Sequence, residues 1–246
     1  MKILAIIPAR MKSSRFPGKP MATINGRPMI EHIFKSVNSC KLINKTVVAT
    51  CDKIISNHIN AIGGISIMTS SKHKRATERC AEALNKLERF QKAFYDIIVM
   101  VQGDEPMVSP KMISSGIKYL LKNKKVNVVN LISKISSSEE FNDQNCIKVV
   151  FDKKFNALYF SRAPIPSNAR IKYNNFYKQV CVMPFRRDFL LNYLKMKETT
   201  LEVQESIDMM RIIENGYKIG LVKTNQKTFS VDTKKDLKKV RLYIKN

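Results

Sequence analysis

Residues 3–20 read ILAIIPARMKSSRFPGKP, and this stretch decides the fold. It opens with the apolar run Ile3–Ile7, which ends at Pro8. A short continuous apolar run rich in β-branched residues is typical of a strand buried on both faces of a parallel sheet. The basic segment that follows is therefore predicted to be a loop at the carboxyl end of that strand.

Three further apolar runs follow at residues 46–50, 65–68 and 97–101. Helical spacing of apolar residues separates them, from Met29 to Val37 and again after Thr77. Alternating strands and helices predict a three-layer α/β fold, with a mixed, mostly parallel sheet and helices on both faces. Because ligands of such sheets bind beyond the carboxyl ends of the strands, the loops 8–21 and 102–106 are candidate site segments.

The second half of the chain is less regular. Strands are predicted at residues 126–132, 147–151, 157–161, 179–184 and 219–222, and helices at residues 189–196, 206–213 and from 233 onward. Asn215-Gly216 is a stop signal for the second of these helices. Since no repeat or low-complexity linker interrupts the chain, we expect a single domain over residues 1–246.

Composition limits the class of protein. Apolar residues make up 44% and charged residues 26%, which favours a folded chain with a sizeable core. No apolar run approaches the roughly 18 residues of a membrane span, and the run at residues 3–8 is too short for a signal peptide. The five cysteines have no C-x-x-C spacing, so free thiols are expected in place of a disulfide framework or zinc site. We expect a cytoplasmic protein that does not insert into membranes.

The formal net charge is +24, and such an excess attracts polyanions. Lysines are spread along the chain, with dense groups only at residues 122–125 and 234–245, and no aromatic-interleaved basic stretch marks a nucleic-acid module. A lysine-rich solvated surface explains most of the excess positive charge. Attraction of anionic substrates explains the rest. Nucleic-acid binding stays an alternative, and it predicts an affinity that falls steeply with salt.

The loop after the first strand carries Arg10, Arg15 and Lys19, and its Ser13 and Gly18 let backbone amides approach an anion. A triphosphate needs such charges and N–H donors on a loop that a rigid strand holds. The loop is not a Walker A motif, because G-x-x-x-x-G-K-[ST] is absent. A basic surface loop with an ordinary Pro-Gly turn explains the same residues equally well.

Acidic residues follow two other predicted elements. Residues 101–106 read VQGDEP, so an apolar strand ends in Gly103 and two carboxylates, and Asp232 precedes the lysine-rich final helix. Mg²⁺ is usually bound by one or two carboxylates together with substrate phosphates, which makes Asp104 and Asp232 candidate metal ligands. Taken alone, Asp104 is more readily interpreted as a residue of an acidic turn or a helix cap, and Asp232 as a helix N-cap that can also bind metal.

Together and in this order, the motifs resemble those of the CMP-Kdo synthetases, Kdo being 3-deoxy-manno-octulosonate, the acidic sugar of the lipopolysaccharide inner core. The matching segments are IPAR and SRFPGKP within residues 7–20, QGDEP at 102–106, LYFSRAPIP at 158–166 and VDT at 231–233. The resemblance spans nearly the whole chain. It implies a Rossmann-like nucleotide-diphospho-sugar transferase fold, with a small antiparallel part through which the family forms homodimers.

The resemblance also implies roles for individual residues. Arg10, Ser13 and Lys19 match positions that hold the CTP phosphates, and Asp104 and Asp232 match two aspartates that bind Mg²⁺. Catalysis is assigned to Arg10, Lys19 and Asp104. The candidate substrate-binding residues are Ser13, Arg15, Thr77, Glu78, Arg79, Gln102, Gln179, Glu205 and Asp208.

Some positions depart from the family pattern. Gln179 and Met183 stand where the family has the His and Tyr of His-x-Gly-x-Tyr, and Asp208-Met209 stands where it has Glu-Gln. Near the nucleotide, Arg75-Ala76 replaces Ser-Gly and Cys51 replaces an aspartate. A pocket that hydrogen-bonds hydroxyl groups discriminates strongly between substrates, so these changes leave the sugar open.

The implied reaction needs no covalent intermediate. The anomeric hydroxyl of the sugar attacks the α-phosphorus of CTP and pyrophosphate leaves, and positioning and charge neutralisation supply most of the catalysis. The leading prediction is a nucleotidyltransferase that joins CMP to Kdo or a close relative, for lipopolysaccharide or surface-polysaccharide synthesis. A cytidylyltransferase for another ulosonic or nonulosonic acid, and a catalytically weakened homologue, remain alternatives.

Overall fold

The computed structural model describes residues 1–13, 15–170 and 175–244. Its strands are β1 (Ile3–Ala9), β2 (Thr23–Ile24), β3 (Arg27–Pro28), β4 (Lys45–Thr50), β5 (Ser66–Met68), β6 (Ile97–Val101), β7 (Val128–Lys134), β8 (Lys148–Phe151), β9 (Ala157–Ser161), β10 (Tyr177–Val180), β11 (Val182–Arg186) and β12 (Ile219–Thr224). Its helices are η1 (Lys19–Met21), α1 (Met29–Asn38), α2 (Lys53–Ala61), α3 (Ala76–Gln91), α4 (Pro110–Lys122), α5 (Ser138–Asn142), α6 (Arg187–Tyr193), α7 (Thr200–Glu205), α8 (Asp208–Glu214) and α9 (Lys234–Tyr243).

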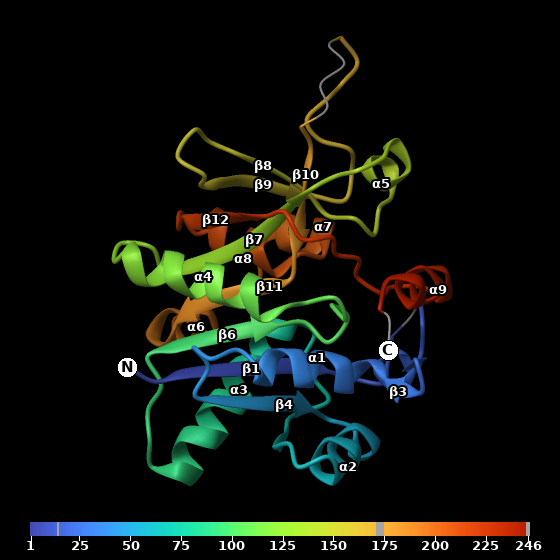
Figure 1. Ribbon diagram of the computed structural model, residues 1–246. Coiled ribbons are helices and arrows are strands. Elements are labelled where there is room, and N and C mark those ends of the chain that lie inside the picture. Colours follow the sequence, from blue (N-terminus) through green and yellow to red (C-terminus); the bar gives the residue numbers. More distant parts are fainter. Residues whose placement is uncertain (14, 171–174, 245–246) are drawn as a thin grey trace.

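One sheet runs through the described chain in the order β5-β4-β1-β6-β11-β7-β10-β8-β9, with β12 added beside β7. The strands β5, β4, β1 and β6 are parallel. From β11 onward the pairs are antiparallel, apart from the parallel pair of β12 and β7. Figure 1 shows β1 and β4 toward one end of the sheet and the β8–β9 hairpin at the other. The predicted mixed α/β sheet is confirmed.

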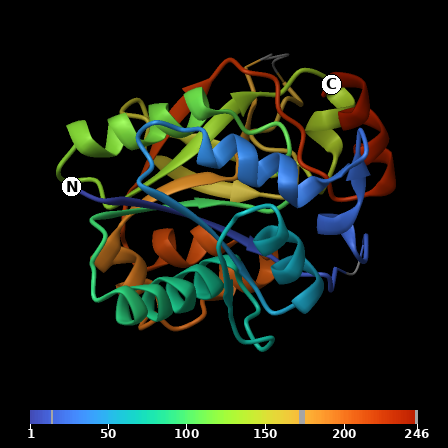
Figure 2. The ribbon, with the colours of Figure 1, turned by 60° about the horizontal axis from the view of Figure 1, so that its bottom comes forward.

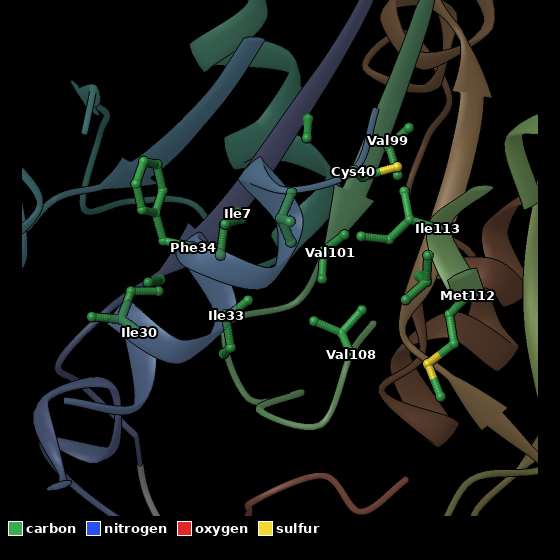
Figure 3. Packing of buried hydrophobic residues seen from close by; sticks show 14 of the residues in the cluster. Ile7, Ile30, Ile33, Phe34, Cys40, Val99, Val101, Val108, Met112 and Ile113 are labelled. Carbon is green, nitrogen blue, oxygen red and sulfur yellow. The ribbon is translucent and has the colours of Figure 1, made fainter. Parts of the chain in front are cut away.

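Helices cover both faces of this sheet. Ile7 of β1 belongs to the hydrophobic cluster that α1 and α4 complete, whereas its neighbour Ile6 belongs to the cluster with α3, α6 and α8. Figure 2 shows α1 and α4 on one side of the strands and α3 on the other. In Figure 3, side chains of α1 and α4 gather around β1 and β6, with Ile33 and Val101 among those labelled. Burial on both faces explains why the strand sequences are continuously apolar.

The predicted strand at residues 179–184 is wrong in one respect, because it is two strands. The first, β10, pairs with β7 and β8, whereas β11 lies between β6 and β7. The change of partners occurs at Cys181, whose N–H donates to Glu105 Oε1 (3.0 Å) and whose carbonyl accepts from the Gln102 N–H (3.1 Å). Pairing with distant strands, which local periodicity does not report, causes the break.

Helix ends also correct two expectations. Asp232 is not the N-cap of α9; that residue is Thr233, whose side chain accepts from the Asp236 N–H. Likewise Asp104 does not cap the next helix, because Ser109 is the N-cap of α4. The predicted stop after α8 is confirmed, with Gly216 in the left-handed region at φ 78°. No helix in the described ranges is long and apolar enough to cross a membrane.

Candidate functional site

The loop that follows β1 is held in place by its own backbone and by β4. Gly18 has φ 77°, a left-handed conformation that glycine adopts without strain, and its N–H donates to the Met11 carbonyl (2.9 Å). The Met11 N–H in turn donates to Asp52 Oδ2 (2.8 Å), just after β4. Lys19 therefore begins η1 from a fixed position beyond the carboxyl ends of the parallel strands.

The turn after β6 approaches the same loop closely. The Gly103 N–H donates to the Pro8 carbonyl (3.2 Å), and a Cβ at residue 103 would lie only 2.8 Å from that oxygen. A side chain larger than hydrogen does not fit there without a shift of backbone. This contact sets Asp104 beside the basic loop.

Lys19, Asp104 and Asp232 meet at this point, although 85 and 213 positions separate the lysine from the two aspartates. Lys19 Nζ donates to Asp104 Oδ2 (2.8 Å) and Asp232 Oδ1 (3.1 Å), and also to the Val231 carbonyl (3.0 Å). Burial alone lowers the pKa of Lys19, but the charges of the two aspartates and their hydrogen bonds raise it above its usual value. Lys19 is therefore protonated at neutral pH.

The aspartate pair has the donor set of a magnesium site. Asp104 Oδ1 is buried and has no hydrogen-bond partner among the described residues, which is costly unless a cation approaches it. Asp232 Oδ1 also accepts from Arg15 Nη2 (2.9 Å). No group of three or more His, Cys, Asp or Glu able to hold a metal occurs in the described part of the chain. Two carboxylates fit Mg²⁺, because phosphates and water supply its other ligands.

Two clefts meet at these aspartates. We call them the small cleft, of about 350 Å³, and the large cleft, of about 860 Å³. The residues that line both are Arg15, Gln102, Asp104, Ser206, Asp208 and Asp232. A ligand in each cleft would therefore bring one end to the aspartate pair.

The small cleft is strongly basic. Four predicted residues line this cleft but not the large one, namely Arg10, Ser13, Lys19 and Arg79. Three more basic residues that were not assigned to the site from the sequence, Lys12, Lys74 and Arg75, line it as well. Arg79 is buried, and its Nη2 has no hydrogen-bond partner among the described residues. Such a concentration of cationic donors is suited to a polyphosphate chain.

The large cleft carries charges of both signs. The predicted residues Gln179 and Asp208 line it, and so does Arg162, which the sequence analysis did not single out. Burial lowers the pKa of Arg162, and the nearby positive charge of Arg15 lowers it further. Two guanidinium groups at one cleft are suited to bind a carboxylate. The signal for Arg162 was available, since the residue lies inside the motif at 158–166.

Comparison with known proteins agrees with this geometry. The chain matches the cytidylyltransferase family model over residues 4–219. It is 40% identical to the 3-deoxy-manno-octulosonate cytidylyltransferase of Geobacter metallireducens, over 98% of this chain and 96% of the relative. It is also 40% identical to that of Fusobacterium nucleatum subsp. nucleatum, over 100% of this chain and 98% of the relative.

A solved structure of CMP:2-keto-3-deoxy-manno-octonic acid synthetase complexed with CTP is similar throughout. The TM-score is 0.87 at 34% sequence identity, and the match covers 99% of this chain and 98% of the other. The chain belongs to the 3-deoxy-manno-octulosonate cytidylyltransferase family.

Three of the predicted substrate-binding residues of this cytidylyltransferase lie behind the cleft walls. Thr77 donates to Asp208 Oδ2 through its N–H (3.1 Å) and its hydroxyl (2.8 Å). Glu78 accepts from the Arg75 N–H (3.3 Å), and Glu205 accepts from the Arg162 N–H (2.8 Å). None of these three predicted residues is among the described residues that line the clefts. They position residues that do, and direct contact with a substrate stays a prediction for them.

Asp208 and Gln179, by contrast, reach the large cleft of the cytidylyltransferase. Burial raises the pKa of Asp208 above its ordinary value, although the two hydrogen bonds from Thr77 act in the opposite direction. Gln179 Nε2 donates to Asn130 Oδ1 (2.7 Å), which fixes the orientation of the amide. Both side chains therefore present defined polar groups to a ligand.

Glu105 is a further residue that the sequence analysis did not assign to the site. It is buried, and it accepts from the Cys181 N–H (3.0 Å) and the Thr228 hydroxyl (3.1 Å). Burial raises its pKa to about 7, and the charge of Asp104 adds to the increase. In the cytidylyltransferase, Glu105 thus joins the β6 turn to β11 and to the C-terminal segment that carries Asp232.

Proposed function

We propose that this protein transfers CMP from CTP to 3-deoxy-manno-octulosonate or a close 2-keto-3-deoxy sugar acid and releases pyrophosphate. The observation that carries the proposal is the meeting of a basic cleft and a larger polar cleft at Asp104 and Asp232. Relatives of similar length carry the name of that activity, and the similar solved structure is complexed with CTP. Such a product serves lipopolysaccharide or surface-polysaccharide synthesis, and we expect it to be made in the cytoplasm.

In this proposal the small cleft takes the nucleotide. Arg10, Ser13 and Lys19 bind the phosphates, because they place charge and hydrogen-bond donors around one wall of that cleft. The sugar occupies the large cleft, with its carboxylate toward Arg15 and Arg162. Both ligands then reach the aspartate pair from opposite sides.

The reaction is a single displacement. The anomeric oxygen of the sugar forms a bond to the α-phosphorus, the bond from that phosphorus to the bridging oxygen breaks, and the hydroxyl proton passes to water. Lys19 and Arg10 stabilise the charge of the departing pyrophosphate. Asp104 and Asp232 would hold Mg²⁺, which when bound neutralises phosphate charge and lowers the pKa of the attacking hydroxyl.

A coupled assay of pyrophosphate release tests the proposal. We expect turnover that requires CTP, Kdo and Mg²⁺ together, that stops with EDTA, and that is weaker with UTP or GTP. Turnover only with other acidic sugars would show that the substrate is a different ulosonic or nonulosonic acid. Absence of turnover with every sugar in the presence of CTP and Mg²⁺ would support a catalytically weakened homologue.

We further propose that the protein is a homodimer that pairs through the β8–β9 end of the sheet. The strand β9 is the last in the sheet order, and Leu158 on it is 56% exposed. An open edge strand with an exposed apolar side chain is a surface that proteins usually cover. Light scattering after gel filtration tests this, with Leu158→Lys expected to shift the species toward monomer and Leu242→Lys, at an exposed site on α9, as control.

A further inference from the structure

The last residue of α7 and the two residues before α8, Glu205–Ile207, lie where the two clefts meet, and we call this segment the α7–α8 junction. Ser206 lines both clefts. Its backbone is left-handed at φ 55°, a conformation that residues other than glycine rarely adopt and that surrounding contacts must hold. Those contacts come from both clefts.

Arg75 contacts the junction from the small cleft, which it lines at the N-terminus of α3. Its Nη1 donates to Ser206 Oγ (2.9 Å), and its Nη2 donates to the Glu202 carbonyl (3.1 Å). The side chain is only 12% exposed. Its Nε lies 3.3 Å from Glu202 Oε1 but is buried without a hydrogen bond.

Arg162 contacts the same junction from the large cleft. Its Nε donates to the Glu205 carbonyl (2.7 Å), and its Nη2 donates to the Ser206 carbonyl (3.4 Å). Ser206 is thus held by one guanidinium group through its side chain and by another through its backbone. Displacement of either arginine would therefore remove a hydrogen bond that holds Ser206 in its left-handed conformation.

Arg75 can change partners without leaving the buried charge of Glu202 unpaired. Its acidic partner Glu202 is fully buried, but Arg211 pairs with the same carboxylate through Nε (2.5 Å) and Nη2 (2.8 Å). Glu202 therefore keeps a bidentate cation when Arg75 moves. A triphosphate in the small cleft adds negative charge on the side of Arg75 that faces the ligand, and so competes for its guanidinium group.

We propose that Arg75, the α7–α8 junction and Arg162 form a bridge through which CTP in the small cleft adjusts the large cleft for the sugar. Arg75 is a positioning residue in this bridge, since it acts on the sugar side through Ser206. The inference rests on the proposed function for the identity of the two ligands. It predicts that the two ligands bind with positive coupling, because each favours the same arrangement of the junction.

The first test needs the nucleotide alone. Hydrogen–deuterium exchange of the full chain is measured with and without a non-reactive α,β-methylene CTP analogue and Mg²⁺. We expect the analogue to change exchange by at least about threefold across residues 202–210 of the wild type, and to leave it unchanged there in Arg75→Lys and Ser206→Ala. Lys86→Ala is the matched control, because it removes a charge from α3, the helix that begins after Arg75, at a site that lines neither cleft, and it should retain the wild-type response.

The second test measures coupling by calorimetry. Kdo should tighten binding of the CTP analogue to the wild type and to Lys86→Ala by at least about fivefold, and by less than twofold in Arg75→Lys. Unchanged exchange at residues 202–210 in analogue-bound wild type, or wild-type coupling in Arg75→Lys, overturns the bridge. If the analogue binds but Kdo does not, the exchange experiment still decides the bridge and the sugar assignment alone fails. If the analogue does not bind, the proposed function fails and the bridge with it.

Discussion

The small and large clefts are built differently. The small cleft is formed by segments that directly follow strands of the parallel half, such as the loop after β1 and the turn after β6. The large cleft draws on the antiparallel half, on α5 and on α9. The small cleft is dominated by positive charge, whereas the large one combines both signs with uncharged polar groups. In the proposed function, phosphate binding therefore depends on charge on short loops, whereas sugar binding depends on side chains that tertiary structure brings together.

The largest effect is expected where the clefts meet. Asp104→Asn removes an anionic oxygen that a hard metal ion prefers, and loss of such charge stabilisation lowers kcat by roughly 10²–10³-fold. The fold should persist, because asparagine still accepts from Lys19. Steady-state pyrophosphate release at saturating CTP and Mg²⁺ measures the effect, with Asp232→Asn expected to behave alike.

Asp188→Asn is the control for this experiment, since Asp188 is 90% exposed and lies on α6. It should keep wild-type turnover. Near wild-type kcat in Asp104→Asn would show that the Asp104 carboxylate is not needed for the reaction. The point where the two clefts meet would then not be the reacting centre.

The next effect is a pH dependence of folding stability that we expect from Glu105, which connects segments of both clefts. Its pKa is about 7 in the folded protein and close to 4.3 in an unfolded chain, so the folded state binds more protons between these values. The contribution of Glu105 to stability should therefore fall as pH rises from about 4.5 to about 7, by at most about 4 kcal/mol, and then level off. Glu105→Gln should lack this fall in urea unfolding at a series of pH values in EDTA.

Glu139→Gln serves as a control, because Glu139 is an exposed residue paired with Lys235. It should reproduce the wild-type slope over the same pH range. A Glu105→Gln variant with that same slope would mean that Glu105 is already ionised in the folded protein.

Lys19→Ala sharpens the comparison between the two ligands. Each lost charge-assisted contact with the triphosphate is worth roughly 1.5–3 kcal/mol, so kcat/KM for CTP should fall by about 10- to 100-fold. The KM for the sugar should change much less, because Lys19 lines only the small cleft. Full kinetics with both substrates varied will check this, and a change confined to the sugar KM would show that the loop serves the other cleft.

The smallest effect concerns the identity of the sugar. Gln179 still offers a hydrogen-bond donor and an acceptor, but Met183, which lines the large cleft, cannot replace the donor of a tyrosine hydroxyl. We expect Kdo to be used poorly, and a modified 2-keto acid sugar to exceed it in kcat/KM by about tenfold, the equivalent of one hydrogen bond. Kdo is compared with 8-amino and nine-carbon analogues. A Kdo value of about 10⁴ M⁻¹s⁻¹ or more that exceeds every analogue would contradict this prediction.

Local sequence pattern predicted one half of the fold better than the other. The strands β1, β4 and β6 are continuous apolar runs because both of their faces are buried, and their positions were predicted closely. Helix α4 was missed although Ser109-Pro110 is a regular N-cap and first-turn pair. The division of β10 from β11 could not be predicted, because pairing with distant strands sets it and residues 179–184 contain no turn signal.

The same distinction holds for the site. Lys19, Asp104 and Asp232 were assigned to one site from the motifs that carry the resemblance, and the structure brings their side chains together. Arg75 and Glu105 were not assigned, because their importance depends on partners more than 70 positions away, such as Ser206 and Cys181. The contribution of the other predicted residues to substrate binding remains a prediction.

The change of partners at Cys181 has a consequence for engineering chimeric enzymes. Gln179 and Met183 lie in one uninterrupted stretch, of which the first part belongs to the antiparallel half and the second is paired with β6, directly before Asp104. A cassette exchanged between relatives to alter sugar preference cannot stop at the β8–β9 hairpin. It must carry β10 and β11 with it and rebuild their contacts with the β6 turn. Backbone pairing thus fixes the crossover point for a transfer of sugar preference, and the donor's residues beside the turn that carries Asp104 are transferred with it.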